Sequence, residues 1–274
     1  MPRPVLVGLP YDASSSFLRG AAHAPAAIRT ALDSPAGNGW AERTGFVLGP
    51  DGLEDAGDLE LGSGAQARDA IEQHVRLIAA SGRAPLLLGG DHSVTYPILR
   101  AIGPLQPKLT VLHIDAHADL YDEFEGDRYS HACPFARVME EGLAAHLVQV
   151  GIRTLTGDQA EQATRFGVEL IDMRAWADGA RPAIAGPVYV SIDLDGLDPA
   201  FAPGVSHREP GGLSVREVLT MLATLTGPIV GADIVEYNPS QDLTGLTAHV
   251  AAKFVKELAG MMLRGPDARL AGLP

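Results

Sequence analysis

Residues 109–119 read Leu-Thr-Val-Leu-His-Ile-Asp-Ala-His-Ala-Asp, so an apolar run leads directly into a cluster of carboxylates and imidazoles. The apolar part, Leu109–Ile114, has the length and composition of a strand that is buried on both faces. The polar part begins where this strand is predicted to end. In open parallel sheets, ligand sites form just beyond the carboxyl ends of the strands. The segment therefore predicts a parallel sheet with a functional site at its carboxyl edge.

Similar apolar runs alternate with segments of helical periodicity along the rest of the chain. The other predicted strands are Val5–Leu9, Pro85–Leu88, Leu147–Val150, Val168–Ile171, Val188–Ile192 and Ile229–Val235. The predicted helices are Gln66–Ala80, Val94–Ala101, Pro134–Glu141, Gly157–Phe166, Val215–Leu225 and Leu246–Leu263. This alternation predicts an α/β fold with three α/β/α layers around a central parallel sheet, formed by one domain spanning residues 1–274.

Local signals refine this prediction. Ser214 stands three residues before Glu217, the spacing of a capping box at the start of a helix. Asp33–Gly64 is rich in Gly, Asp and Pro without clear periodicity, and we expect an irregular excursion there. Pro266–Pro274 is expected to be a loose tail or an oligomer contact.

Composition excludes several classes of protein. The formal net charge is −13 and Lys and Arg form no run, so nucleic acid is not an expected partner. The acidic balance is compatible with a small cationic substrate. Cys133 is the single cysteine, which rules out an internal disulfide and agrees with a reducing compartment. The first residues show no export signal and no run of 18 apolar residues follows, so we expect a cytoplasmic protein without a membrane partner.

Four polar clusters are predicted to follow strands at the same sheet edge. They are Gly89-Gly90-Asp91-His92-Ser93, Asp115-Ala116-His117-Ala118-Asp119, Asp193-Leu194-Asp195 and Glu236. Any one of them has an ordinary explanation as a helix cap or a turn. Burying all of them side by side costs many kcal/mol through repulsion and desolvation unless cations offset it.

The donor types indicate which metal would bind. Asp and His donors without thiolate suit manganese, zinc or ferrous iron, and the excess of carboxylates favours manganese. An extended Asp-x-His-x-Asp segment points its three side chains to one side, which suits two adjacent ions.

These motifs resemble those of the ureohydrolases, the family of arginase and agmatinase. The resemblance rests on residues 89–92, 115–119, Ser191–Pro199 and Glu236, in the family's order over nearly the whole chain. It implies an arginase-like fold and two Mn²⁺ per subunit. One ion would be held by His92, Asp115, Asp119 and Asp193, and the other by Asp115, His117, Asp193 and Asp195.

The resemblance also implies catalytic and substrate-binding residues. Glu236 would pair with the guanidinium of the substrate, and His131 would supply a proton to the leaving nitrogen, with Asp119 passing protons onward. His113 is expected to support the site or to pack, rather than to bind metal directly. The family further implies a homo-oligomer, a trimer or a hexamer.

The substrate is predicted from what the chain lacks. Arginases carry a Ser-x-Asn-x-His type segment, whereas Asp127-Arg128-Tyr129-Ser130-His131 resembles agmatinases, so agmatine, giving putrescine in polyamine metabolism, is the expected substrate. Gly204-Val205-Ser206-His207 departs from the family's usual Gly-Thr-Gly-Thr and places His207 beside the substrate.

Other substrates and activities stay open. Arg128 or Arg208 would suit a substrate carboxylate, so arginase and a hydrolase of guanidinobutyrate or guanidinopropionate remain alternatives. A single-metal deacetylase would be expected to show a tandem His-His, and a two-metal phosphoesterase would need basic residues near its ions. A catalytically silent metal-binding scaffold would be expected to lack one of the ligands or Glu236.

Overall fold

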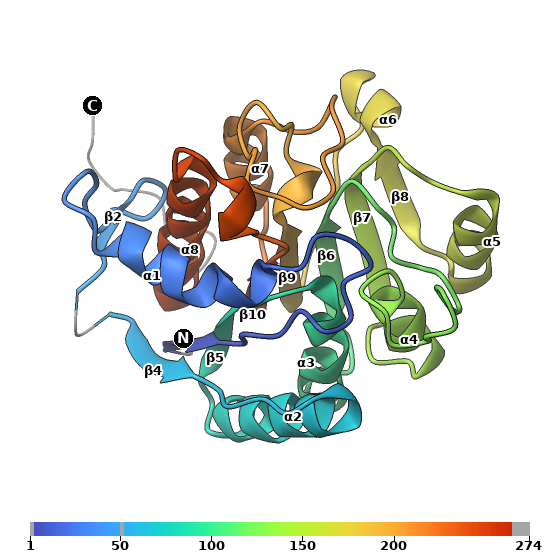
Figure 1. Ribbon diagram of the computed structural model, residues 1–274, viewed down its shortest axis with the longest axis horizontal. Coiled ribbons are helices and arrows are strands. Elements are labelled where there is room, and N and C mark those ends of the chain that lie inside the picture. Colours follow the sequence, from blue (N-terminus) through green and yellow to red (C-terminus); the bar gives the residue numbers. More distant parts are fainter. Residues whose placement is uncertain (1–2, 50–51, 265–274) are drawn as a thin grey trace.

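The computed structural model describes residues 3–49 and 52–264, and its centre is an eight-stranded sheet whose neighbouring strands are all parallel (Figure 1). The strand order is β4-β1-β5-β10-β9-β6-β7-β8. The bounds are β1 Pro4–Gly8, β4 Glu54–Asp58, β5 Ala84–Leu88, β6 Thr110–Ile114, β7 His146–Ile152, β8 Glu169–Asp172, β9 Val188–Asp193 and β10 Ile229–Val235. The predicted parallel sheet is confirmed.

Helices cover both faces of the sheet, because successive residues of each buried strand point to opposite sides. Leu6 of β1 belongs to one core and its neighbours Val5 and Val7 belong to the other. The first core is covered by α1 (Ala24–Leu32), α6 (Met173–Ala177), α7 (Val215–Leu222) and α8 (Leu246–Arg264). The second is covered by α2 (Gly64–Ala80), α3 (Thr95–Ile102), α4 (Pro134–Glu140) and α5 (Gly157–Phe166). These are the three layers that the sequence predicts.

The capping box at the start of α7 is also confirmed. The Ser214 Oγ atom accepts the Glu217 N–H at 3.2 Å, and the Glu217 carboxylate accepts the Ser214 N–H at 2.8 Å.

The expectation of an irregular excursion over Asp33–Gly64 is wrong for its second half. Residues 54–58 form the edge strand β4, whose sequence Glu-Asp-Ala-Gly-Asp contains no large apolar residue. An edge strand needs only backbone pairing on one side, so the apolar signal used for the other strands is missing. Arg29 of α1 pairs with Asp55 and Asp58 of this strand. The short hairpin of β2 (Trp40–Ala41) and β3 (Phe46–Val47) lies in the same region, whereas Pro266–Pro274 lies outside the described residues.

The order of the sheet decides where the polar clusters lie. β5, β10, β9 and β6 are consecutive neighbours at its centre, and each is followed by one of the predicted clusters. Because the strands are parallel, their carboxyl ends lie at one edge. Within the described residues, no helix is both long and apolar enough to cross a membrane.

Candidate metal centre

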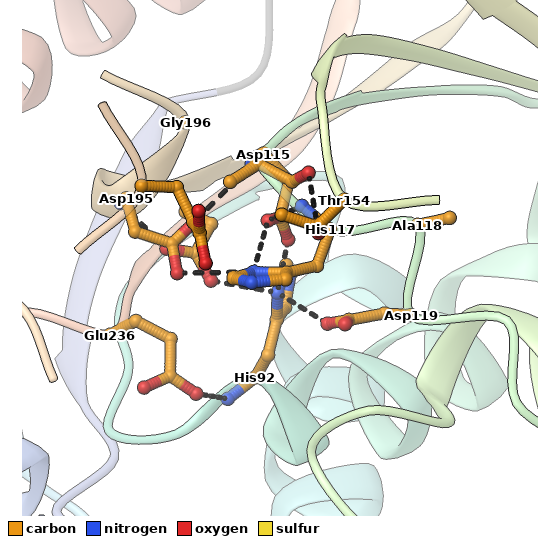
Figure 2. A network of polar contacts seen from close by, with 12 residues as sticks. His92, Asp115, His117, Ala118, Asp119, Thr154, Asp195, Gly196 and Glu236 are labelled. Carbon is orange, nitrogen blue, oxygen red and sulfur yellow. Dashed lines mark hydrogen bonds and ion pairs between the residues drawn. The ribbon is translucent and has the colours of Figure 1, made fainter. Parts of the chain in front are cut away.

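The predicted metal ligands lie together beyond the ends of these central strands (Figure 2). His92 opens the short helix η2 (His92–Val94) after β5, and Asp115 directly follows β6. Asp193 is the last residue of β9, and Asp195 lies in the short helix η4 (Leu194–Gly196).

His92 forms the centre of a first subsite. Its Nδ1 atom lies 3.1 Å from one carboxylate oxygen of each of Asp115, Asp119 and Asp193. This nitrogen is buried and has no hydrogen-bond partner. A buried nitrogen facing three carboxylate oxygens is unfavourable unless it is protonated or a cation lies between these atoms. The donor set fits a metal ion.

His117 marks a second subsite beside the first. Its Nδ1 atom lies 3.4 Å from Asp115 Oδ1 and 3.3 Å from Asp195 Oδ2. Asp115 thus turns Oδ2 toward His92 in the first subsite and Oδ1 toward His117 in the second, as expected of a ligand shared by two subsites. Asp193 turns Oδ2 toward His92, while its Oδ1 accepts the Asp195 N–H at 2.8 Å.

The charges of the cluster support cation binding. Burial, together with the charges of Asp195 and Asp115, raises the pKa of Asp193 well above its ordinary value. Burial also raises the pKa of Asp195 to about 6. Both directions mean that burial and neighbouring carboxylates disfavour the charged forms of Asp193 and Asp195 when no cation is present. The carboxylates Asp115, Asp119, Asp193 and Asp195 match the charge of two divalent ions, and hard oxygen donors suit Mn²⁺.

Unusual backbone conformations hold the site in place. Asp119 and Glu236 have φ angles of 51° and 61°, in the left-handed region that residues other than glycine rarely adopt. At Gly90 an added Cβ would lie 1.7 Å from the Tyr11 carbonyl oxygen, so only glycine fits where these two loops meet.

Glu236 and His131 are in direct contact. Glu236 Oε1 accepts the His92 N–H at 2.9 Å and lies 3.0 Å from His131 Nδ1. His131 Nε2 lies 2.8 Å from Ser16 Oγ. Burial alone would lower the pKa of His131, but the hydrogen bond and the charge of Glu236, with the charges of Asp119 and Asp91, together outweigh it and raise this pKa to about 9.

A cavity of about 280 Å³ opens beside these groups. It is lined by Ser16, His117, Asp119, Tyr121, Phe124, His131, Ala132, Thr154, Thr156, Gln159, Asp193, Asp195, His207 and Glu236. The ring of His207 lies 5.4 Å from that of His131 and 5.8 Å from that of His117. Burial lowers the pKa of His207, so this ring adds a neutral wall.

The charged loop residues considered for substrate recognition are engaged elsewhere. Arg128 pairs with Asp122 and Glu140. Arg208 contacts the Pro203 carbonyl and the Gln241 side chain. Neither arginine lines the cavity.

Several residues that sequence reasoning missed support the ligands. Gln149 donates to His113 Nδ1 at 2.9 Å, and His113 Nε2 lies 2.7 Å from Asp115 Oδ2. Both ring nitrogens of His113 therefore have partners, and His113 also belongs to the group of donors around His92 that could hold an ion. Ser191 Oγ lies 2.9 Å from His92 Nε2 and donates to Asp233 Oδ1 at 2.6 Å. The available signal was a polar residue within an otherwise apolar strand.

Comparisons with known proteins agree with this site. A parallel α/β sheet with an Asp- and His-rich cluster at its carboxyl edge is the arrangement of a metal-binding protein. The arginase family model matches residues 3–260, and the chain belongs to the arginase family. It is a hydrolase that cleaves a guanidino C–N bond and releases urea. The cofactor of this family is the expected manganese pair, and the cluster is able to hold metal ions.

Individual relatives include arginases and agmatinases. Arginase 1, mitochondrial, of Arabidopsis thaliana is 46% identical over 93% of this chain and 79% of the plant protein. Agmatinase of Bacillus anthracis is 34% identical over 93% of this chain and 90% of its own length. The solved structure of arginase from Medicago truncatula superposes with a TM-score of 0.90 at 44% identity, covering 95% of this chain and 87% of that one.

Proposed function

We propose that this protein hydrolyses L-arginine to ornithine and urea. The proposal takes arginine over the agmatine predicted from Asp127–His131, because the plant arginases are 44–46% identical to this chain and the Bacillus agmatinases 34%. A guanidino acid recognised by Arg128 or Arg208 is disfavoured, since both arginines are engaged outside the cavity.

The observation that carries the proposal is the chemistry of the cavity wall. Ser16, Thr154, Thr156 and Gln159 line it with neutral hydroxyl and amide groups, which also bond within the protein, Ser16 to His131 and Thr154 to the Ala116 carbonyl. Such groups both donate and accept hydrogen bonds, so they suit an α-carboxylate and an α-ammonium together. Agmatine presents only an ammonium, which the acidic residues of the run 122–125 would suit. Asp122 of that run pairs with Arg128 and Arg137 instead.

The proposed metal ligands are the six predicted ones. His92, Asp115, Asp119 and Asp193 would hold one Mn²⁺, and Asp115, His117, Asp193 and Asp195 the other. When bound, such a pair lowers the pKa of water to about 7 and so supplies a nucleophile near neutral pH.

The remaining steps belong to side chains of this protein. Glu236 accepts guanidinium N–H groups in a charge-assisted contact and fixes the carbon over the metal site. The water oxygen adds to this carbon, and the bond to the alkyl-bearing nitrogen breaks. His131 gives that nitrogen a proton, so that it leaves as the neutral amine rather than as an amide-like anion. His207 forms the wall beside the substrate, and Asp119 passes protons onward.

A substrate series tests the proposal. Urea release by the Mn²⁺-loaded protein is measured with three substrates. They are L-arginine, agmatine, which lacks the carboxylate, and 4-guanidinobutyrate, which lacks the amino group and is one carbon shorter. We expect kcat/KM to be highest for L-arginine by about tenfold or more, equivalent to about 1.4 kcal/mol of head-group recognition. A higher kcat/KM for agmatine would refute the arginine proposal and leave the urea-forming class intact.

Two further features stay proposals. We place the enzyme in the cytoplasm, on the evidence of its single, buried Cys133. We also propose a homo-oligomer, a trimer or hexamer, which sedimentation of the purified chain would test.

A further inference from the structure

Asp233 is a buried carboxylate in the middle of β10 that the proposed reaction does not use. It is 0% exposed and accepts hydrogen bonds from hydroxyl groups on two other elements. Tyr189 Oη and Thr95 Oγ1 donate to its Oδ2 at 2.7 and 2.8 Å, and Ser191 Oγ donates to its Oδ1 at 2.6 Å. Both carboxylate oxygens of Asp233 therefore have hydrogen-bond partners, as buried polar atoms require.

The Asp233 carboxylate determines the direction of the hydrogen bond between Ser191 and His92. A serine hydroxyl carries one proton, and that of Ser191 is donated to Asp233. Ser191 Oγ can therefore only accept from His92 Nε2, which lies 2.9 Å away. His92 must then carry its proton on Nε2. The ring is also held by Phe135, which packs against it edge-on with centroids 5.3 Å apart.

We propose that Asp233, acting through Ser191, is a positioning residue that keeps the His92 Nδ1 lone pair free for the first metal ion. With Nε2 protonated, Nδ1 faces the oxygens of Asp115, Asp119 and Asp193 as a ligand rather than as a donor. The inference rests on the proposed ligand role of His92. Asp233 would thus select between the two tautomers of the His92 imidazole, although it reaches this ring only through Ser191.

Asp233→Asn is the most informative substitution, because an amide has nearly the shape of a carboxylate but can donate a hydrogen bond where the carboxylate only accepts one. If the new amide donates to Ser191 Oγ, the serine proton is free to turn toward His92 Nε2. This arrangement favours a proton on Nδ1, which blocks the metal. Tyr189→Phe is the matched control, because it removes a neighbouring donor to the same carboxylate without touching the Ser191 link.

Manganese binding is the readout, measured by equilibrium dialysis of folded protein with atomic absorption. Loss of a residue that orients a metal-binding histidine typically weakens metal binding about 10- to 100-fold. We expect Asp233→Asn to retain one tightly bound Mn²⁺ and to bind the second about 10- to 100-fold more weakly. Tyr189→Phe should bind both ions within about threefold of wild type, inside the scatter of single-contact effects.

The outcomes separate this inference from the proposed function. Wild-type affinity for both ions in Asp233→Asn, or an equal loss in Tyr189→Phe, would overturn the inference while leaving arginine hydrolysis untouched. If the wild-type protein binds two manganese ions but does not hydrolyse arginine, the proposed substrate is wrong and the inference about Asp233 still stands. If Asp233→Asn does not fold, Ser191→Ala tests the inference instead. This substitution deletes the acceptor for His92 Nε2 and should weaken the binding of one manganese ion selectively. Unchanged manganese affinity in Ser191→Ala would refute the positioning role of Asp233.

Discussion

Replacement of Arg153 should reveal how strongly the loops around the site depend on one side chain. Arg153 follows β7 and donates to the carbonyl oxygens of Gly151, Asp195, Gly196, Leu197 and Glu209 at 2.6–3.2 Å. It therefore joins the segment that carries Asp195 to the loop that carries His207. Arg153→Met keeps the aliphatic volume and removes every donor.

The size of the effect follows from these contacts. A hydrogen bond to a charged group contributes about 1.5–3 kcal/mol, but contacts within one cluster are not additive and water can replace some of them. We expect the free energy of unfolding to fall by about 3–5 kcal/mol, the range for breaking a buried charged interaction. For a chain of this size that corresponds to a Tm decrease of about 6–15 °C.

Calorimetric melting of the Mn²⁺-loaded protein measures this effect. Arg174→Met is the matched control, since the Arg174 side chain is 92% exposed and its pair with Asp172 should contribute at most about 1 kcal/mol. If Arg153→Met melts within about 2 °C of that control, which is about 1 kcal/mol or less for this length, the carbonyl cluster does not stabilise the loops and the reasoning fails.

Three other substitutions test separate parts of the site. Asp193→Ala should lower urea release by more than about 100-fold, beyond the loss from a merely supporting contact, and near-normal turnover would contradict its ligand role. His207→Thr should shift the ratio of kcat/KM for arginine over agmatine by about tenfold with manganese content unchanged, because its ring lines the cavity; a constant ratio would remove His207 from substrate recognition. Gly90→Ala should lower stability by about 3 kcal/mol or more, as its Cβ would overlap the Tyr11 carbonyl. Gly157→Ala, where the added Cβ meets no atom within 4 Å, is the control, and equal melting temperatures would show that the loops separate freely.

The fold was predictable wherever strands are buried on both faces. The run Ile229–Val235 coincides with β10, and Gly157–Phe166 coincides with α5. Prediction failed at β4, whose sequence Glu54–Asp58 has no large apolar residue to reveal it. An edge strand is stabilised by hydrogen bonds to a neighbour that is distant in sequence, and local pattern carries no trace of that partner.

The supporting groups of the site were harder to predict than the ligands. Asp115 and Asp193 stand directly at strand ends and His92 lies shortly after one, where parallel topology alone brings side chains together. Asp233 and Ser191 lie inside strands, and their roles depend on the sheet order that places β9 between β10 and β6. That order is set by which crossovers bury the most apolar surface together, a property of the whole chain.

The sequence by itself determined the class of chemistry. The Asp- and His-rich strand ends leave few solutions other than metal binding, because buried carboxylates repel one another without cations. Tertiary structure alone decided which of the candidate side chains line the cavity. Arg128, an open candidate in the sequence, pairs with Asp122 at 2.8 Å, whereas His207 lines the cavity. Such pairings depend on the distances between loops, and those distances exist only once the sheet has brought the loops to one edge.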